Sequence, residues 1–340
     1  MTEALTQSLL DRLGRPIRDL RVSVTDRCNF RCRYCMPREH FGAGHEFLPR
    51  TQLLSFEELA RVAAVVAALG VVKVRLTGGE PLLRANLERL VSQLTQIPGL
   101  EVALTTNGSL LKRSAQALAD AGLSRLTVSL DGLDPEIFRR MTDADYTPAD
   151  VLEGIAAAER AGLSRIKINT VVRRGVNDSE ILPLARHFHG SGHVLRFIEY
   201  MDVGGTNDWS RRDVVTAEEI VARIDSELPL EPLEPSAFGE VAERHRYRSG
   251  GGEIGVIASI TKPFCGNCTR LRLSSEGRLY TCLFATQGED LRERLRAGAT
   301  DAELAEFVRN LWQQREDRYS ELRVPERRRL PRIEMSYIGG

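Results

Sequence analysis

Short apolar runs alternate with amphipathic segments along the first 200 residues. Residues 19–25 alternate apolar and polar side chains, which predicts a strand. Further strands are predicted at residues 71–77, 102–106, 126–130, 166–172 and 194–200. Helices are predicted between them, at about 55–69, 86–96, 110–121, 135–161 and 179–189. This alternation predicts an α/β fold with a parallel sheet and right-handed crossovers.

Local signals support these elements. Ser55-Phe-Glu-Glu58 is a capping box, a typical helix start. Ala121-Gly-Leu-Ser-Arg-Leu-Thr-Val128 recurs forty residues later as Ala161-Gly-Leu-Ser-Arg-Ile-Lys-Ile168, and each copy combines a helix end, a glycine stop and a strand. An open doubly wound sheet and a curved partial barrel both fit this pattern. The first strand lacks a following Gly-x-Gly-x-x-Gly, which disfavours a dinucleotide-binding fold.

The pattern changes after about residue 205. Residues 228–235 are rich in proline and glutamate, and Ser249-Gly-Gly-Gly252 predicts a turn or linker. Helices are predicted at 289–296 and 301–314, whereas residues 36–50 are predicted to form an irregular loop. We therefore divide the chain into two regions, 1–205 and 206–340.

Composition and charge exclude several classes of function. The chain has 340 residues, 42% of them hydrophobic, with 47 basic and 47 acidic residues. We expect no nucleic-acid and no membrane partner, because no overall charge attracts either and no apolar run could span a bilayer. The start of the chain lacks the pattern of a signal peptide, so we expect a cytoplasmic protein. Cysteines stay reduced there, which favours metal binding over disulfides.

Three cysteines fall within eight residues, at Cys28, Cys32 and Cys35. Clustered thiolates suit a soft metal or an iron–sulfur cluster. The flanking Arg27 and Arg31 argue against simple burial of these thiols. A structural zinc site with a borrowed fourth ligand is the alternative. The motif follows a predicted strand, and active sites of parallel α/β folds lie at that end of the strands.

A second set of three cysteines occupies Cys265, Cys268 and Cys282. A zinc ribbon would need a fourth ligand, but no cysteine remains and no histidine follows residue 245. Two sets of three thiols therefore predict two clusters, each with one open metal position. Between the two sets, Thr77-Gly-Gly-Glu-Pro81 predicts a strand end where backbone approaches a ligand closely.

Basic residues recur on the predicted strands. Lys73 and Arg75 are two residues apart and share one face of a strand, as do Arg270 and Arg272. Each of these residues alone is more simply explained as part of a solvated face. Together, cations on several strands predict a cavity that binds a polyanion such as a triphosphate. The chain has no Gly-x-x-x-x-Gly-Lys-Ser/Thr loop, so side chains would have to hold such a ligand.

The spacing of the first cysteines, with Tyr34 before the last, resembles the radical S-adenosylmethionine superfamily, as does the Gly-Gly-Glu-Pro strand end. The resemblance narrows to the GTP 3′,8-cyclase family through five stretches and extends from about residue 12 to the last residue. These stretches are residues 19–37, 196–204, 262–273, 277–283 and 335–340.

The resemblance implies an incomplete, six-unit βα barrel of TIM type, with a C-terminal segment that carries a second iron–sulfur cluster. It implies two 4Fe-4S clusters, one on each set of cysteines. Residues matching the S-adenosylmethionine contacts of the family are Tyr34, Gly79, Ser129 and Met201. Residues matching its GTP contacts are Arg21, Lys73, Arg75, Thr106, Lys167, Arg196, Arg270 and Arg272. Catalytic roles are implied for Arg21, Arg270, Arg272, Gly339 and Gly340, the last two in a tail that enters the cavity.

The implied reaction is the cyclisation of GTP in the first step of molybdenum cofactor biosynthesis. An electron from the first cluster would cleave S-adenosylmethionine, and the resulting radical would remove the 3′ hydrogen of the ribose before the sugar attacks C8. The implied partners are GTP, a reducing electron donor and a cyclic pyranopterin monophosphate synthase that takes the product. The oligomeric state, including a homodimer, stays open. Two rival functions also stay open: another radical enzyme with an auxiliary cluster, and a zinc-binding interaction module.

Overall fold

The computed structural model describes residues 9–323 and 332–339. Its strands are β1 (Asp19–Ser23), β2 (Lys73–Thr77), β3 (Glu101–Thr106), β4 (Arg125–Ser129), β5 (Lys167–Val172), β6 (Val194–Glu199), β7 (Leu230–Leu233), β8 (Glu243–Tyr247), β9 (Glu253–Ile257), β10 (Arg270–Leu273), β11 (Arg278–Tyr280) and β12 (Glu289–Asp290). The described residues form one twelve-stranded sheet in the order β12-β11-β10-β1-β2-β3-β4-β5-β6-β9-β8-β7.

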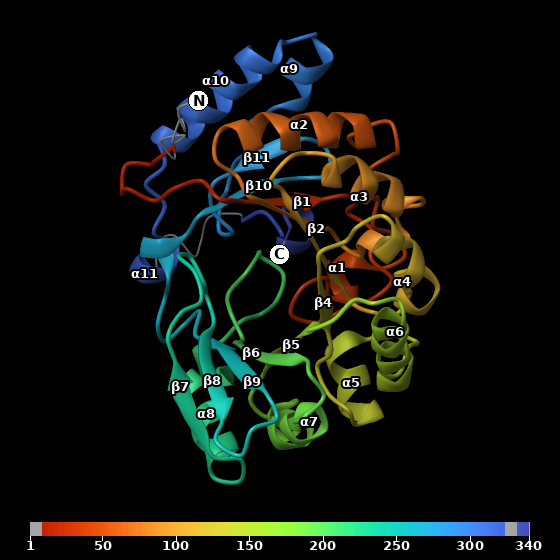
Figure 1. The fold of residues 1–340 in the computed structure, drawn as a ribbon, viewed down its shortest axis with the longest axis vertical. Helices are drawn as coiled ribbons and strands as arrows, with labels where there is room; N and C mark the ends of the chain where they lie inside the picture. The colour runs from red at the N-terminus through yellow and green to blue at the C-terminus, as the bar shows by residue number, and fades with distance from the viewer. Residues whose placement is uncertain (1–8, 324–331, 340) are drawn as a thin grey trace.

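The middle of this sheet is parallel. From β10 through β1–β6 to β9, each strand runs parallel to its neighbours, whereas β7, β8, β11 and β12 are antiparallel additions at the edges. Figure 1 shows the sheet curving around the centre of the molecule, with helices outside it. The end strands β12 and β7 do not pair with each other in the described part of the chain, so the barrel is incomplete. The predicted α/β class and partial barrel are confirmed.

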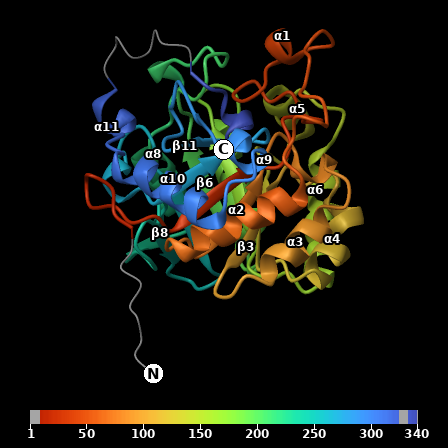
Figure 2. The ribbon, with the colours of Figure 1, turned by 90° about the horizontal axis from the view of Figure 1, so that it is seen from above.

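Helices connect the strands and cover the outer face of the sheet. They are α1 (Arg38–Phe41), α2 (Phe56–Ala68), α3 (Leu87–Thr95), α4 (Leu111–Asp120), α5 (Pro135–Thr142), α6 (Pro148–Arg160), α7 (Ile181–Phe188), α8 (Ala217–Asp225), α9 (Arg292–Arg296), α10 (Asp301–Gln313) and α11 (Tyr319–Leu322). Figure 2, seen from above, shows α2 and α10 lying side by side, in agreement with the contacts between these helices. No helix of the described ranges is both long and apolar enough to span a membrane.

The alternation in β1 separates the core from the cavity. Leu20 and Val22 are fully buried in the hydrophobic core, while Arg21 between them lines the central cavity. Burial of apolar side chains on the helix-covered face stabilises each βα unit. The inner face is consequently left for polar side chains, as the period of two along a strand requires.

The predicted local signals are confirmed. At the start of α2, the Ser55 hydroxyl accepts a hydrogen bond from the Glu58 N–H (3.1 Å), and the Ser55 N–H donates to the Glu58 carboxylate (2.7 Å). The two copies of the internal repeat share the glycine that follows the helix, but Arg125 already begins β4, whereas Arg165 has a φ of +49° and precedes β5. Gly122 and Gly162 end α4 and α6 with φ of +89° and +90°, values that favour glycine.

Three predictions differ from the structure. The predicted helix 135–161 is two helices, because Thr147 caps a new helix and Pro148 occupies its first position. The predicted helix 289–296 begins only at Arg292, since residues 289–290 pair with β11 as strand β12. The loop predicted at 36–50 contains the short helix α1.

The C-terminal part of the chain extends both edges of the barrel sheet. Strand β9 pairs with β6, and β10 pairs with β1. The resemblance implies a C-terminal segment that carries the second cluster, and the strands of this segment continue the same sheet on either side. The division into 1–205 and 206–340 remains a prediction.

Candidate active site

The first three cysteines lie in the loop that follows β1 and line a cavity of about 320 Å³. Cys28, Cys32 and Cys35 are all free thiols. The guanidinium of Arg31 fixes this loop by donating to the carbonyls of Cys28 (2.8 Å) and Phe41 (2.6 Å). Since these bonds hold backbone rather than sulfur, the thiols are free to bind metal.

Burial controls the protonation of these thiols. It raises the pKa of Cys28 to about 12, and the nearby carboxylate of Glu80 adds to the effect. Burial also raises the pKa of Cys32 and of Cys35. In the metal-free protein the three thiols are therefore neutral at pH 7, and binding of iron would release their protons.

Two glycines bring the end of β2 against the cysteine loop. A Cβ at Gly79 would lie 2.3 Å from the carbonyl oxygen of Arg27, and one at Gly78 would lie 2.5 Å from that of Thr25. The Gly79 N–H also donates to the Thr25 carbonyl at 2.8 Å. Only glycine permits this approach. The exposed backbone beside three thiols fits the cluster and S-adenosylmethionine that the resemblance implies.

Two buried carboxylates, one after β2 and one after β4, were missed by sequence reasoning. Glu80 accepts hydrogen bonds from the Thr106 hydroxyl and the Asn107 N–H, both at 2.7 Å, and burial raises its pKa to about 7. Asp131 accepts a hydrogen bond from the Tyr34 hydroxyl at 2.8 Å, and burial raises its pKa to about 6. Glu80 stands within the Gly-Gly-Glu-Pro motif, which could have drawn attention to it. Asp131 has no local signal, because it is 97 residues from its partner.

The second set of cysteines lines the same cavity from the opposite part of the chain. Cys265 and Cys268 precede β10, and Cys282 follows β11. Arg270 Nε lies 3.3 Å from the Cys268 sulfur. Burial would raise the pKa of Cys268, but Arg270 and Arg315 outweigh burial and lower that pKa to about 6. Burial raises the pKa of Cys282 to about 12.

The cysteines do not converge on one point. Within the ranges 9–323 and 332–339, no three His, Cys, Asp or Glu side chains lie close enough to hold a single metal ion. An iron–sulfur cube needs a wider arrangement, because each thiolate binds a different iron atom. The chemistry of the donors, three thiols in each set, fits such a cluster.

A row of arginines crosses three adjacent strands. The register of the sheet places Arg21 of β1 between Arg272 of β10 and Arg75 of β2, and all three line the cavity. Burial and the neighbouring arginines lower the pKa of Arg21 well below its usual range. Like charges on adjacent strands destabilise a sheet. A bound polyanion would relieve this repulsion with charge-assisted hydrogen bonds.

The other predicted cations differ in their surroundings. Burial and Arg75 lower the pKa of Arg196 on β6 to about 9. Burial, together with Arg196 and Arg75, lowers the pKa of Lys167 on β5 to about 8. Lys73, by contrast, forms an ion pair with Asp19. Its charge is therefore already compensated, whereas Arg196 and Lys167 face further positive charge.

Most predicted site residues meet in one place. All six cysteines line the cavity, together with Arg21, Tyr34, Arg75, Gly79, Thr106, Ser129, Arg196, Met201, Arg270 and Arg272. Lys73, Lys167 and Gly339 are not among its lining residues, and Gly340 lies outside the described residues. The role of each residue remains a prediction.

The C-terminal tail packs against the arginine row. Arg272 Nη1 donates to the carbonyls of Gly339 and, at 3.5 Å, Ile338. Gly339 has a φ of +73°, and a Cβ there would lie 2.7 Å from the Thr77 hydroxyl oxygen and 3.4 Å from the Cβ of Arg21. The tail can therefore lie beside these strands only with glycine at this position.

Two protein-family models match the chain. The model described as Radical SAM superfamily matches residues 22–188, and the one described as Molybdenum Cofactor Synthesis C matches residues 193–321. The chain is 55% identical to a GTP 3′,8-cyclase of Acidothermus cellulolyticus, over 99% of this chain and 100% of that protein. GTP 3′,8-cyclases of Xanthomonas axonopodis pv. citri and Staphylococcus aureus are 52% and 48% identical, each over 99% of this chain and their full length.

Solved structures share the fold at lower identity. Streptococcus suis SuiB bound to S-adenosylmethionine matches with a TM-score of 0.59 and 17% identity, over 88% of this chain and 66% of that one. SuiB bound to its precursor peptide SuiA matches with a TM-score of 0.61 and 15% identity, over 90% and 66% of the two chains. The chain thus spans just under two thirds of SuiB, and the likeness concerns the fold alone.

Proposed function

Because the chain belongs to the GTP 3′,8-cyclase family, we propose that it cyclises GTP to (8S)-3′,8-cyclo-7,8-dihydroguanosine 5′-triphosphate, in the first step of molybdenum cofactor biosynthesis. One observation carries the proposal: both sets of cysteines and the arginine row line a single cavity. A cofactor bound at one set of thiols and a nucleotide bound at the other would share that space.

The residues that would hold the clusters are the two sets of cysteines. Three thiolates leave one iron of a four-iron cube without a protein ligand. S-adenosylmethionine would take this position on the set at Cys28, and the guanine base would take it on the set at Cys265. When bound, the first cluster and S-adenosylmethionine supply one-electron radical chemistry.

The chain itself orients the cofactor. Because Gly79 has no side chain, S-adenosylmethionine could approach its backbone closely, next to the cysteine loop. Tyr34 is held in place by its hydrogen bond to Asp131. Ser129 and Met201 line the cavity from the ends of β4 and β6. Together these groups would hold S-adenosylmethionine in one orientation, which is how binding contributes to rate.

The arginine row would bind the triphosphate. Arg21, Arg75 and Arg272 can each donate charge-assisted hydrogen bonds, worth roughly 1.5–3 kcal/mol apiece. The tail at Gly339 lies against Arg21 and accepts from Arg272, so it would help to hold both guanidiniums towards the nucleotide. These contacts favour a highly charged substrate over a neutral one.

Parts of the fold would also shield the reaction from water. Radicals attack any nearby hydrogen donor, so the site must be closed. Strands β9 and β10 continue the barrel on both sides, and Met335 and Ser336 of the tail line the cavity. Electrons would come from a separate reducing donor, and the product would pass to a cyclic pyranopterin monophosphate synthase.

The test is anaerobic incubation with dithionite, S-adenosylmethionine and GTP carrying deuterium at C3′. We expect 5′-deoxyadenosine that contains deuterium, the cyclised triphosphate, and about eight irons per chain from two four-iron clusters. A colourless protein that contains zinc would refute the proposal. Formation of 5′-deoxyadenosine without cyclised product or deuterium transfer would refute the substrate alone.

Two variants test the first set of cysteines and the arginine row separately. Cys28→Ser is expected to abolish formation of 5′-deoxyadenosine, since it removes a ligand of the first cluster. Arg272→Ala is expected to lower cyclised product while some 5′-deoxyadenosine still forms. The control is Arg12→Ala, because the Arg12 side chain is 57% exposed in an ion pair with Glu316. An equal loss of cyclised product in Arg12→Ala and Arg272→Ala would show that Arg272 has no specific role.

A further inference from the structure

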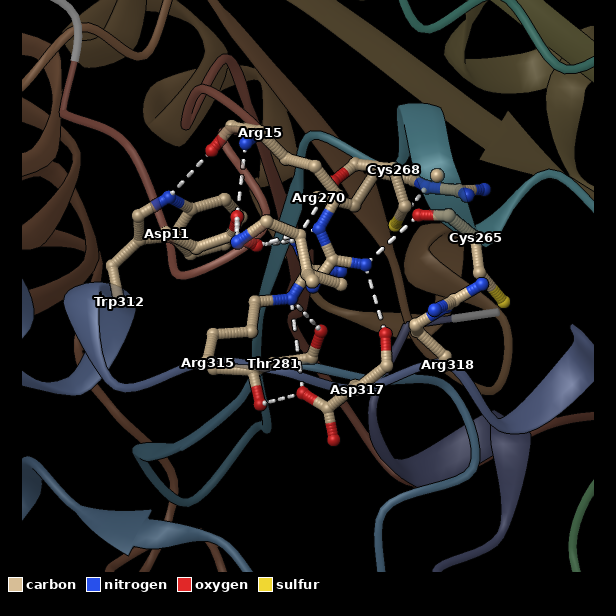
Figure 3. A network of polar contacts seen from close by, with 12 residues as sticks. Asp11, Arg15, Cys265, Cys268, Arg270, Thr281, Trp312, Arg315, Asp317 and Arg318 are labelled. Atoms are coloured by element: carbon tan, nitrogen blue, oxygen red, sulfur yellow. Dashed lines mark hydrogen bonds and ion pairs between the residues drawn. The ribbon is translucent and has the colours of Figure 1, made fainter. Parts of the chain in front are cut away.

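Two buried arginines hold the backbone around the second set of cysteines (Figure 3). Arg15 Nη1 donates to the carbonyl of Cys265 at 2.8 Å. Arg315 Nη1 donates to the carbonyl of Cys268 at 2.7 Å, and its Nε donates to the carbonyl of Thr281 at 3.0 Å. Thr281 immediately precedes the third cysteine. All three cysteine segments are thus fixed through backbone carbonyls, and no sulfur is used.

One carboxylate joins the two arginines. Asp11 Oδ2 lies 2.6 Å from Arg15 Nε and 3.3 Å from Arg315 Nη1. The side chains of all three residues are at most 1% exposed. A buried guanidinium without a partner is strongly destabilising. Asp11 therefore bridges the two guanidiniums and fixes their relative orientation, and its single negative charge leaves these three residues with one net positive charge.

The same network joins distant parts of the chain. Trp312 at the end of α10 is fully buried and donates from Nε1 to the Arg15 carbonyl at 3.1 Å. Arg15 also donates to the Asp317 carbonyl at 2.8 Å, and the Asp317 carboxylate accepts from the Thr281 hydroxyl at 2.6 Å. The N-terminal segment, the end of α10 and the β10–β11 region are consequently locked together behind the second set of cysteines.

The charges of the network would act on anything bound to these thiols. Arg270 Nε is 3.3 Å from the Cys268 sulfur, and Arg315 is bonded to the carbonyl of the same cysteine. Positive charge close to a thiolate-bound cluster stabilises its reduced form, because reduction adds negative charge. Residues behind the ligands also hold the ligands in the geometry that the metal needs.

We propose that Asp11, Arg15 and Arg315 form a clamp that positions the second iron–sulfur cluster and raises its reduction potential. This inference rests on the proposed second cluster. The clamp residues act through the cysteines and need not touch GTP, so they are positioning residues. Arg315 serves two of the three cysteine segments and is therefore the member to test.

The test uses the full-length chain with Cys28, Cys32 and Cys35 all changed to serine, so that only the second set can hold iron. Into this parent we would introduce Arg315→Lys, Arg315→Met and, as a matched control, the exposed Arg12→Met. After anaerobic reconstitution, the measurements are iron content, the electron paramagnetic resonance spectrum of the reduced cluster, its reduction potential, and the rate of iron loss to a chelator.

Lysine keeps the charge of Arg315 but cannot reach both carbonyls as a planar fork does. Arg315→Lys should therefore change the spectrum and lose iron about tenfold faster, the usual scale for residues behind a metal ligand. Arg315→Met should in addition shift the potential to more negative values. Arg12→Met should match the parent in every measurement.

The outcomes distinguish a failure of the clamp proposal from a failure of the proposed second cluster. If the parent itself binds no iron at the second set, the proposed second cluster is wrong. If the parent holds a cluster and both Arg315 variants match it in spectrum, potential and iron loss, only the clamp is wrong. If Arg315→Met does not fold, Arg315→Lys decides alone: parent-like iron loss and spectrum would overturn the proposal.

Discussion

At the scale of single residues, the part of the site next to the first three cysteines depends on a missing side chain, that of a glycine, as much as on the cysteines themselves. Gly79 has no side chain, and the backbone of Arg27 occupies the space that a Cβ would need. The cysteine loop and the end of β2 are therefore in contact through backbone alone. Any side chain at this position would separate the thiols from the glycine-rich strand end.

Gly79→Ala should accordingly damage cofactor cleavage. The added Cβ would meet the Arg27 carbonyl oxygen at 2.3 Å, which forces the backbone to shift at a cost of about 1–3 kcal/mol. We expect 5′-deoxyadenosine formation to fall at least about tenfold. Gly44→Ala is the matched control, because a Cβ there would meet no heavy atom within 4 Å. Wild-type cleavage by the Gly79 variant would show that the close packing has no functional role.

A second residue-scale prediction concerns Lys167, whose pKa is lowered to about 8 by burial and nearby arginines. Above pH 8 this lysine is mostly neutral in the free protein. A bound triphosphate would raise its pKa again, so binding would take up a proton. Affinity for GTP should then fall as pH rises from about 8 to 10, by up to about tenfold per pH unit.

The measurement is calorimetric titration of the reconstituted protein with GTP at several pH values. Between pH 8 and 9, where Arg196 with its pKa of about 9 still keeps its proton, Lys167→Met should lose the slope, and the difference from wild type removes the nucleotide's own titration. The exposed Lys112, paired with Glu153, provides the control Lys112→Met, which should keep the slope. A slope that survives in Lys167→Met would assign the proton to another group.

The cysteine positions could be predicted from sequence because their spacing is local, and their lining of one cavity follows from the ends of the strands that carry them. Thr106 shows what this reasoning does not include. Its hydroxyl donates to the buried Glu80, a partner that no local pattern predicts, and its expected contact with GTP remains a prediction. Asp11, Arg15 and Arg315 belong to no recognised motif, since hydrogen bonds across 250 and 304 residues decide their roles. Only the packed chain reveals such partners.

At the scale of elements, strands β1–β6 were predictable because each has an apolar face that must pack under helices. The edge strands were not. In β8 (Glu243–Tyr247) most side chains are polar and half-buried, so the sequence shows no apolar alternation that would predict this strand. Strand β8 is instead held in place by its backbone pairing with β9 and β7.

The C-terminal tail is an element whose docking can be tested at one contact, the carboxylate of Glu334. The Glu334 carboxylate accepts hydrogen bonds from the Gly205 N–H (2.9 Å) and the Thr206 hydroxyl (3.1 Å), in the loop that follows β6. Hydrogen bonds to a charged group contribute roughly 1.5–3 kcal/mol. Their loss should shift the docked tail towards an undocked state by about tenfold or more.

Glu334→Ala should therefore lower the yield of cyclised product per 5′-deoxyadenosine, while iron content and S-adenosylmethionine binding stay at wild-type levels. Glu316→Ala serves as the control, because that carboxylate is 70% exposed and pairs only at the surface with Arg12. An unchanged product ratio in Glu334→Ala would mean that this carboxylate does not keep the tail in the cavity.

At the scale of the whole molecule, one sheet unites what the sequence suggested were two regions. β10 pairs with β1 at one side of the barrel strands, and β9 pairs with β6 at the other. The second set of cysteines and Arg272 reach the cavity on these additional strands. The shared cavity is thus a consequence of the way in which the C-terminal part completes the sheet.

Removing residues 206–340 should abolish folding of the remainder. A chain of residues 1–205 would expose an unpaired edge at both β1 and β6, and unpaired edges promote association with other chains. It would also remove Arg315, Trp312 and the Cys265 carbonyl, which bond to Asp11 and Arg15 in the intact chain. We expect insoluble protein or a circular dichroism signal without a cooperative thermal transition. Co-expression with residues 206–340 should restore solubility, because the fragments would pair at both edges. A cooperative transition from residues 1–205 alone would show that the barrel strands form an independent domain.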